Sequence, residues 1–143
     1  FENMGLQVKD EIPGEERRVG EVLMDVHRSY LKDIEGLLAE DLLNGLAHIT
    51  GGGIEGNLPR IFPIGIGAKI DTTSWEVPNV FKVLEDGGNV ADREMYRVFN
   101  MGIGMILAVQ EDDVARVLAV LKEGQSDCRL IGRVETGEGV RLE

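Results

Sequence analysis

Apolar residues recur every three to four positions in several stretches of the chain, which is the spacing of one face of a helix. The clearest stretch runs from Ile34 to Leu42, and Asn44-Gly45 follows it as an expected C-cap. Gly87-Gly88 and Gly124 are expected to end two later helices in the same way. The full pattern predicts helices over residues 19–24, 34–42, 54–58, 78–88, 92–99 and 112–123.

Shorter apolar runs bounded by glycine and polar residues predict strands. The run NMGIGMILAV, residues 100–109, is almost entirely apolar and predicts a strand that is buried on both faces. The other strands are predicted over residues 27–31, 46–50, 68–71, 129–134 and 139–142, the last two around a Thr136-Gly137 turn. The resulting order of elements predicts an α+β fold or an α/β sandwich.

The first 18 residues carry no sustained apolar period and contain Pro13-Gly14 and several charges. This composition is typical of a connecting segment. We therefore expect residues 1–18 to be a linker from a missing N-terminal domain and residues 19–143 to be the folded domain. The chain begins at Phe1 without an initiator methionine, which favours a fragment of a longer protein.

The composition limits the classes of function. A chain of 143 residues that is 43% hydrophobic fits one domain. Its formal net charge of −11 argues against nucleic acid and anionic membranes as partners, so any anionic ligand must be held by local groups. The single cysteine, Cys128, excludes an internal disulfide, and no apolar run is long enough to span a membrane. These features predict a cytoplasmic protein.

The stretch GLAHITGGGIEGNLPR places three glycines between a predicted strand and a predicted helix. Successive N–H groups of Gly51, Gly52 and Gly53 can converge on one anion, and Thr50 can add a hydroxyl. Asn57 and Arg60, just downstream, are expected to close around this phosphate cradle. The alternative is that the glycines only form a sharp turn. Three glycines after a threonine exceed what a turn needs, so the anion site is favoured.

A second glycine-rich stretch, EMYRVFNMGIGM, contains Asn100, Gly102 and Gly104. Either a ligand or a closely packed helix can explain glycines on a buried strand, and the residues favour neither. The only histidines are His27 and His48, and two histidines alone do not complete a zinc site, so no metal site is predicted. His48 is a candidate binding residue because it directly precedes the glycines. No catalytic residue is assigned.

Four stretches together resemble a known family in the same order. They are LAHITGGGIEGNLPR, IDTTSWEVPNVFKVLEDGGNV, EMYRVFNMGIGM and IGRVETGEGV. They resemble the C-terminal domain of the aminoimidazole ribonucleotide synthetases, also called phosphoribosylformylglycinamidine cyclo-ligases. The resemblance covers the chain from about Gly20 onward. It implies a three-layer α/β/α domain with a mixed sheet and a partly ferredoxin-like topology.

The resemblance also implies an activity. Enzymes of this family use ATP to activate the amide oxygen of formylglycinamidine ribonucleotide as a phosphate ester, and an internal nitrogen then closes the imidazole ring of purine biosynthesis. The N-terminal domain supplies most contacts to ATP and Mg²⁺ and forms the homodimer, while the C-terminal domain closes the cleft. The chain is therefore expected to be inactive alone and to line a cleft with HITGGG, residues 48–53, and FNMGIGM, residues 99–105.

One stretch departs from the family pattern. Where the family reads approximately LLEPTRIYVK, this chain has LMDVHRSYLK, with Val26-His27 in place of Pro-Thr. This difference leaves room for a diverged relative. Two alternatives to the cyclo-ligase domain remain open at this point: a free-standing module that binds a phosphate or nucleotide without catalysis, and a structural or dimerisation domain.

Overall fold

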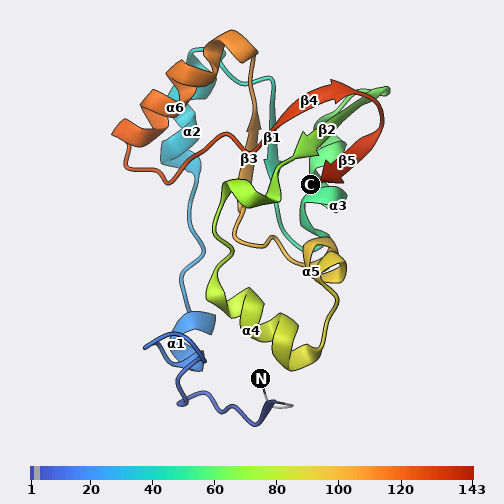
Figure 1. The fold of residues 1–143 in the computed structure, drawn as a ribbon. Coiled ribbons are helices and arrows are strands. Elements are labelled where there is room, and N and C mark those ends of the chain that lie inside the picture. Colours follow the sequence, from blue (N-terminus) through green and yellow to red (C-terminus); the bar gives the residue numbers. More distant parts are fainter. Residues whose placement is uncertain (2–3) are drawn as a thin grey trace.

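The computed structural model describes Phe1 and residues 4–143 (Figure 1). The helices are α1 (Val19–Leu23), α2 (Leu31–Ala39), α3 (Gly53–Asn57), α4 (Asn79–Gly88), α5 (Asp92–Val98) and α6 (Val114–Glu123). The strands are β1 (Gly45–His48), β2 (Ile66–Ile70), β3 (Met105–Ala108), β4 (Gly132–Thr136) and β5 (Gly139–Leu142). Short 3₁₀ turns cover Leu58–Ile61, Thr72–Ser74 and Glu111–Asp113.

The strands form two separate sheets. β1 and β3 pair antiparallel, with Gly45 opposite Ala108 and His48 opposite Met105. The second sheet has the order β4-β2-β5, in which β2 is antiparallel to β4 and parallel to β5. The chain between β4 and β5 passes around the start of β2, where the Gly137 N–H donates to the Gly65 carbonyl at 2.9 Å. The predicted α+β class is confirmed.

Three clusters of buried side chains hold these elements together. The main cluster joins β1, α3, β2 and β3 and includes Ile49, Ile54 and Trp75. A second cluster packs α2 against α6 through Leu37 and Val117, and Figure 1 shows these two helices side by side at one end of the molecule. Because burial of apolar side chains is the main stabilising contribution to folding, the main cluster fixes the segments between β1, α3 and β3.

The third cluster joins the N-terminal residues to α1 and α4. Ile12 is 1% exposed and packs with Val19 of α1 and Val83 of α4. A bridge between Glu11 and Arg18 brings the two ends of the intervening turn together. The segment predicted as a linker therefore contributes a buried side chain to this domain.

Some predicted element ends are wrong because the chain caps its helices differently. The helix predicted to reach Leu42 ends at Ala39, and Gly45 is the first residue of β1 instead of a cap. Gly124 is the C-cap of α6 with a φ of −73°, and the left-handed residue is Gln125. The helices expected at residues 19–24, 54–58, 78–88 and 92–99 are present within one or two residues of the predicted bounds.

Two predicted strands also need correction. Residues 25–30 have no regular secondary structure, and α2 begins at Leu31, so the strand expected over residues 27–31 is wrong. Among the residues that the structure describes, no strand pairs with residues 25–30 through backbone hydrogen bonds. The strand expected over residues 100–109 is only Met105–Ala108, and of these four residues only Ile106 is buried. The glycines of this run lie in the turn before the strand.

Candidate functional site

The first glycine loop, residues 50–53, connects the end of β1 to the start of α3. Gly52 has a φ of +98° and Gly53 a φ of +60°, which side chains with a Cβ rarely adopt. A Cβ at Gly53 would also lie 2.0 Å from the carbonyl oxygen of Tyr96. Gly53 therefore lets the loop pack against the end of α5. Gly51 differs, because a Cβ added there would meet no atom within 4 Å.

The N–H groups of this loop are mostly used inside the protein. Gly52 donates to the carbonyl of Val98 at 3.3 Å, and Gly53 donates to the carbonyl of Thr50 at 3.1 Å. Two of the three N–H groups assigned to a phosphate cradle are therefore already engaged in this conformation. Thr50 and Gly51 are exposed. The donors that face solvent are thus at the start of the loop.

Asn57 has a role that differs from the predicted one. Its side chain is 5% exposed, and its amide nitrogen donates to the carbonyls of Gly53 at 2.8 Å, Gly51 at 3.3 Å and Thr50 at 3.4 Å. A group engaged with three backbone oxygens is not available to close around a ligand. Asn57 instead holds the first glycine loop in shape from the inside. Arg60, in the following 3₁₀ turn, is exposed.

The second glycine loop, residues 100–104, is a tight turn before β3. The Asn100 side-chain oxygen accepts a hydrogen bond from the Gly102 N–H at 3.1 Å. Met101 is 2% exposed with a φ of +49°, and its carbonyl accepts a hydrogen bond from the Trp75 indole at 2.9 Å. Gly102 has a φ of +96°, and a Cβ there would lie 2.5 Å from the Pro78 ring. Close packing against other segments thus explains why this loop contains glycine.

The structure brings the two glycine loops together. The N–H of Ile49 donates to the carbonyl of Gly104 at 2.9 Å, which extends the β1–β3 pairing by one step. The Tyr30 hydroxyl lies only 1.8 Å from where a Cβ on Gly104 would be. His48, the last residue of β1, is exposed beside this contact. The two motifs that the sequence analysis treated separately therefore share one end of the β1–β3 sheet.

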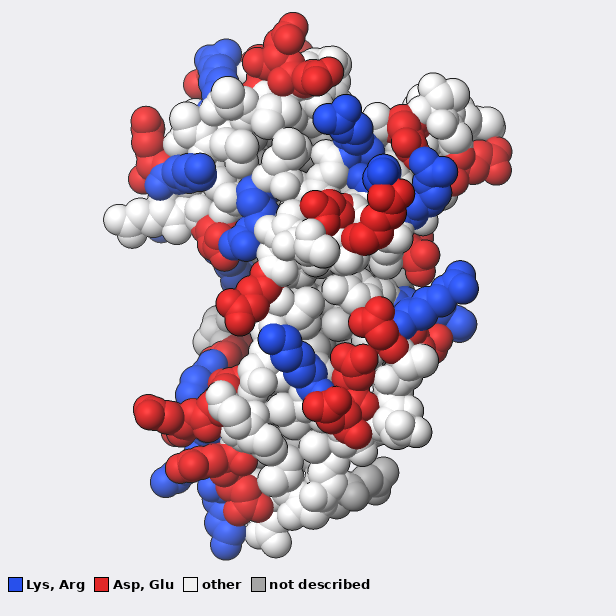
Figure 2. Space-filling model, in the orientation of Figure 1, with Lys and Arg blue, Asp and Glu red and all other residues white. Residues whose placement is uncertain are grey.

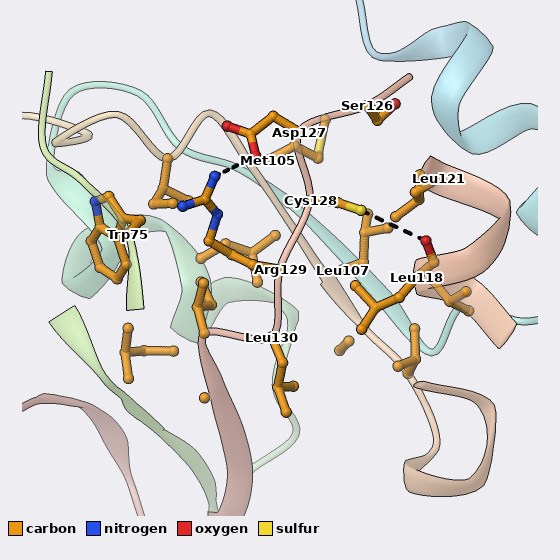
Figure 3. Close-up of a pocket in the computed structure, with 18 of the residues that line it drawn as sticks. Trp75, Met105, Leu107, Leu118, Leu121, Ser126, Asp127, Cys128, Arg129 and Leu130 are labelled. Atoms are coloured by element: carbon orange, nitrogen blue, oxygen red, sulfur yellow. Dashed lines mark hydrogen bonds and ion pairs between the residues drawn. The ribbon is translucent and has the colours of Figure 1, made fainter. Parts of the chain in front are cut away.

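A cavity of about 860 Å³ lies on another side of β3 (Figure 3). Apolar side chains from β3, α6 and the segment before β4 line much of it, among them Leu107, Leu118 and Leu130. The Cys128 thiol donates to the Leu118 carbonyl at 3.8 Å. The sequence does not predict this cavity, because its lining residues belong to segments in which the apolar spacing indicates burial but no cavity. Of the predicted binding residues, only Gly102 lines it.

Charge is mixed on this protein surface. Figure 2 shows acidic and basic side chains interspersed over the visible face, with no continuous basic patch on that face.

The hydroxyl of Ser126 and the guanidinium of Arg28 lower the pKa of the Asp33 carboxyl below its ordinary value. Burial raises the pKa of the Tyr96 phenol. Among the described residues, no group of three His, Cys, Asp or Glu side chains is arranged to hold a metal ion.

The chain also matches a known protein family. Residues 3–143 match the family described as "AIR synthase related protein, C-terminal domain". The chain belongs to this family. No helix in the described part of the chain is both long and apolar enough to cross a membrane.

Curated relatives carry a more specific name. The chain is 46% identical over 134 residues to a phosphoribosylformylglycinamidine cyclo-ligase of Geobacter metallireducens, a match that covers 94% of this chain and 38% of the relative. It is 42% identical over 138 residues to the chloroplastic cyclo-ligase of Arabidopsis thaliana, covering 96% and 36%. It is 41% identical over 140 residues to that of Bacillus pumilus, covering 98% and 40%. The chain thus spans 36–40% of the length of these relatives.

Proposed function

We propose that this chain is the C-terminal domain of an ATP-dependent phosphoribosylformylglycinamidine cyclo-ligase of purine biosynthesis. In the proposed reaction, ATP phosphorylates the amide oxygen of formylglycinamidine ribonucleotide. An internal nitrogen then attacks the same carbon, and phosphate leaves as the imidazole ring closes. The observation that carries the proposal is the contact between the two glycine loops, because it supports a single site built from both motifs. The names of the curated relatives support the same activity.

Within this domain, the exposed start of the first glycine loop is the proposed phosphate contact. Thr50 can donate its hydroxyl and Gly51 its backbone N–H, and a hydrogen bond to a charged acceptor contributes about 1.5–3 kcal/mol. His48 and Arg60 are exposed and are proposed to contact the substrate. The remaining predicted residues are proposed to shape the loops around it: Gly52, Gly53, Asn57, Asn100, Gly102 and Gly104.

The rest of the enzyme is proposed to supply ATP and Mg²⁺ binding. Among the described residues, no group of three His, Cys, Asp or Glu side chains is arranged to hold a metal ion. We further propose a homodimeric, cytoplasmic full-length enzyme in which residues 1–18 connect to the N-terminal domain. The edge of β3 that does not pair with β1, and the cavity beside it, are surfaces that such a domain can cover. The present chain itself is proposed to be the three-layer, partly ferredoxin-like domain.

The test is reconstitution. The 143-residue chain, alone and mixed with a separately made N-terminal domain of a relative, is titrated with ATP, Mg²⁺ and formylglycinamidine ribonucleotide while phosphate release and imidazole formation are followed. We expect turnover only in the mixture. Silence in the mixture together with saturable phosphate binding by the chain alone would instead favour a binding module without catalysis.

A pair of matched variants tests the phosphate contact. Gly51 and Gly56 are both exposed, and at neither position would an added Cβ meet an atom within 4 Å. Gly51→Glu places a negative charge at the proposed contact, whereas Gly56→Glu adds the same charge on the outer side of α3. We expect Gly51→Glu to abolish turnover of the reconstituted enzyme and Gly56→Glu to leave at least half of it. Equal activity in both variants would remove Gly51 from the site.

A further inference from the structure

The two histidines of the chain meet in the fold, although 20 residues separate them in the sequence. The Nε2 atoms of His27 and His48 lie 3.3 Å apart, and their rings are nearly perpendicular with centres 5.2 Å apart. His27 belongs to the segment between α1 and α2 that departs from the family pattern, and His48 is the last residue of β1. The proposed cyclo-ligase function does not explain this contact.

The separation of the two nitrogens matches that of two ligands on one ion. Imidazole nitrogens bind zinc at about 2.0–2.1 Å, so two of them on a tetrahedral ion lie about 3.3 Å apart. The same arrangement puts the ring centres about 5.2 Å apart, because each ring centre lies directly behind its nitrogen. Both separations agree with those in the structure. We propose that His27 and His48 bind one divalent zinc ion through their Nε2 atoms.

The surroundings suit an open site rather than a closed structural one. Both histidines are exposed, so water can occupy the remaining two coordination positions. One nearby cation is already paired: Arg28, whose guanidinium carbon lies 5.7 Å from the centre of the Tyr30 ring, is bound to Asp33 at 3.0 Å. The chain as a whole is acidic, with a formal charge of −11, which favours a divalent cation.

Binding needs one rearrangement of a proton. When the rings form a hydrogen bond, one of them carries its proton on Nε2 and the other accepts there. Zinc needs a lone pair on both Nε2 atoms, so the donor ring must move its proton to Nδ1. For two neutral imidazoles this shift releases no net proton, and no other reactant is needed. The ion replaces the shared hydrogen and links the 25–30 segment to the end of β1.

The experiment is a zinc titration of the 143-residue chain by calorimetry, with the two imidazoles followed by nitrogen-15 NMR. Because the chain has only two histidines, every imidazole signal belongs to this pair, and the His27→Gln variant shows which signal is which. We expect one zinc ion per chain, a shift of both Nε2 signals, and a higher melting temperature at saturating zinc. Absence of saturable binding, or binding that leaves either Nε2 signal unmoved, would overturn the proposal.

Three variants complete the test. His27→Gln and His48→Gln are each expected to weaken zinc binding at least tenfold and to remove the zinc-dependent rise in melting temperature. Cys128→Ser removes the only thiol of the chain and is expected to leave the affinity unchanged. Zinc binding of unchanged strength in either histidine variant would contradict the proposed pair, and so would a tenfold loss in Cys128→Ser.

Discussion

The two glycine loops are neighbours, because Ile49, just before the first loop, donates its N–H to the Gly104 carbonyl of the second, yet they are stabilised in opposite ways. The first, residues 50–53, is held from inside by one buried amide, that of Asn57, which donates to three of its carbonyls. The second, residues 100–104, is enclosed from outside by side chains of distant segments, Pro78 against Gly102 and Tyr30 against Gly104. Only the first contains a glycine, Gly51, at which an added Cβ would meet no atom within 4 Å. Glycine content alone therefore does not distinguish a loop that can meet a ligand from one that is filled by the protein.

The largest effect is expected where the first loop packs on α5. Gly53→Ala places a Cβ at 2.0 Å from the Tyr96 carbonyl oxygen in a left-handed conformation. Overpacking and backbone strain together should lower the free energy of unfolding by about 2–5 kcal/mol. Urea unfolding followed by circular dichroism measures it. A loss below about 0.5 kcal/mol would mean that the contact with α5 is not part of the stable fold.

A smaller loss is expected from the inner support of the same loop. Asn57→Leu keeps the approximate volume but leaves the Gly53 carbonyl without its buried donor, at a cost of about 1–3 kcal/mol in unfolding free energy. The same urea experiment measures this cost.

Asn57→Asp is the matched comparison. A carboxylate facing carbonyl oxygens is disfavoured, so the folded state raises the pKa of the introduced acid. Stability is then highest below the ordinary pKa of aspartate, about 4, and falls as pH rises above it. A variant that is equally stable at pH 3 and pH 7, relative to the parent chain, would contradict this geometry.

The second loop should respond more mildly, because a flexible side chain can move away. Gly104→Ala displaces the Tyr30 hydroxyl and should cost about 1 kcal/mol. Adding Tyr30→Phe removes that hydroxyl and should recover part of the loss. A double-mutant cycle of urea unfolding measures the coupling between the two sites. Strictly additive effects would show that Tyr30 does not enclose this loop in solution.

The smallest effect on stability is expected at Gly51. Gly51→Ala meets no atom within 4 Å, and Gly51 does not have a positive φ. The free energy of unfolding should change by less than about 0.5 kcal/mol. Differential scanning calorimetry checks this. A loss comparable to that of Gly53→Ala would place the whole glycine run under structural constraint and leave none of it for a ligand.

Much of the fold follows from the sequence, but the helix ends do not. Helices α2, α4 and α6 are followed by left-handed residues that are not glycine: Asp41, Asn89 and Gln125. In the first of these, Leu42 donates its N–H to the Leu37 carbonyl at 3.0 Å, and both side chains join one cluster. The apolar spacing therefore correctly indicated that Leu42 packs beside Leu37. Leu42 reaches this place as part of the cap that follows α2, not as part of the helix.

The candidate site was predictable in position and not in detail. The HITGGG stretch indicated a loop between a strand and a helix, which is present. The carbonyls that constrain Gly52 and Gly53 belong to Val98 and Tyr96 of α5. The local sequence pattern does not show that α5 packs against this loop. One signal was available for Asn57. It lies beside the buried Leu58 and one helical turn after the start of α3. A buried polar side chain at such a position needs a hydrogen-bond partner inside the protein.

The path of the chain around β2 also dictates the order in which the protein can assemble. β2 obtains both of its neighbours, β4 and β5, from residues that follow it by about 60 to 70 positions. During synthesis on the ribosome, β1, α3 and the helices up to α6 can therefore emerge while β2 still lacks any partner strand. The three-stranded sheet can close only after residues 132–142 have emerged, so it cannot form before the contacts within residues 45–123 are available.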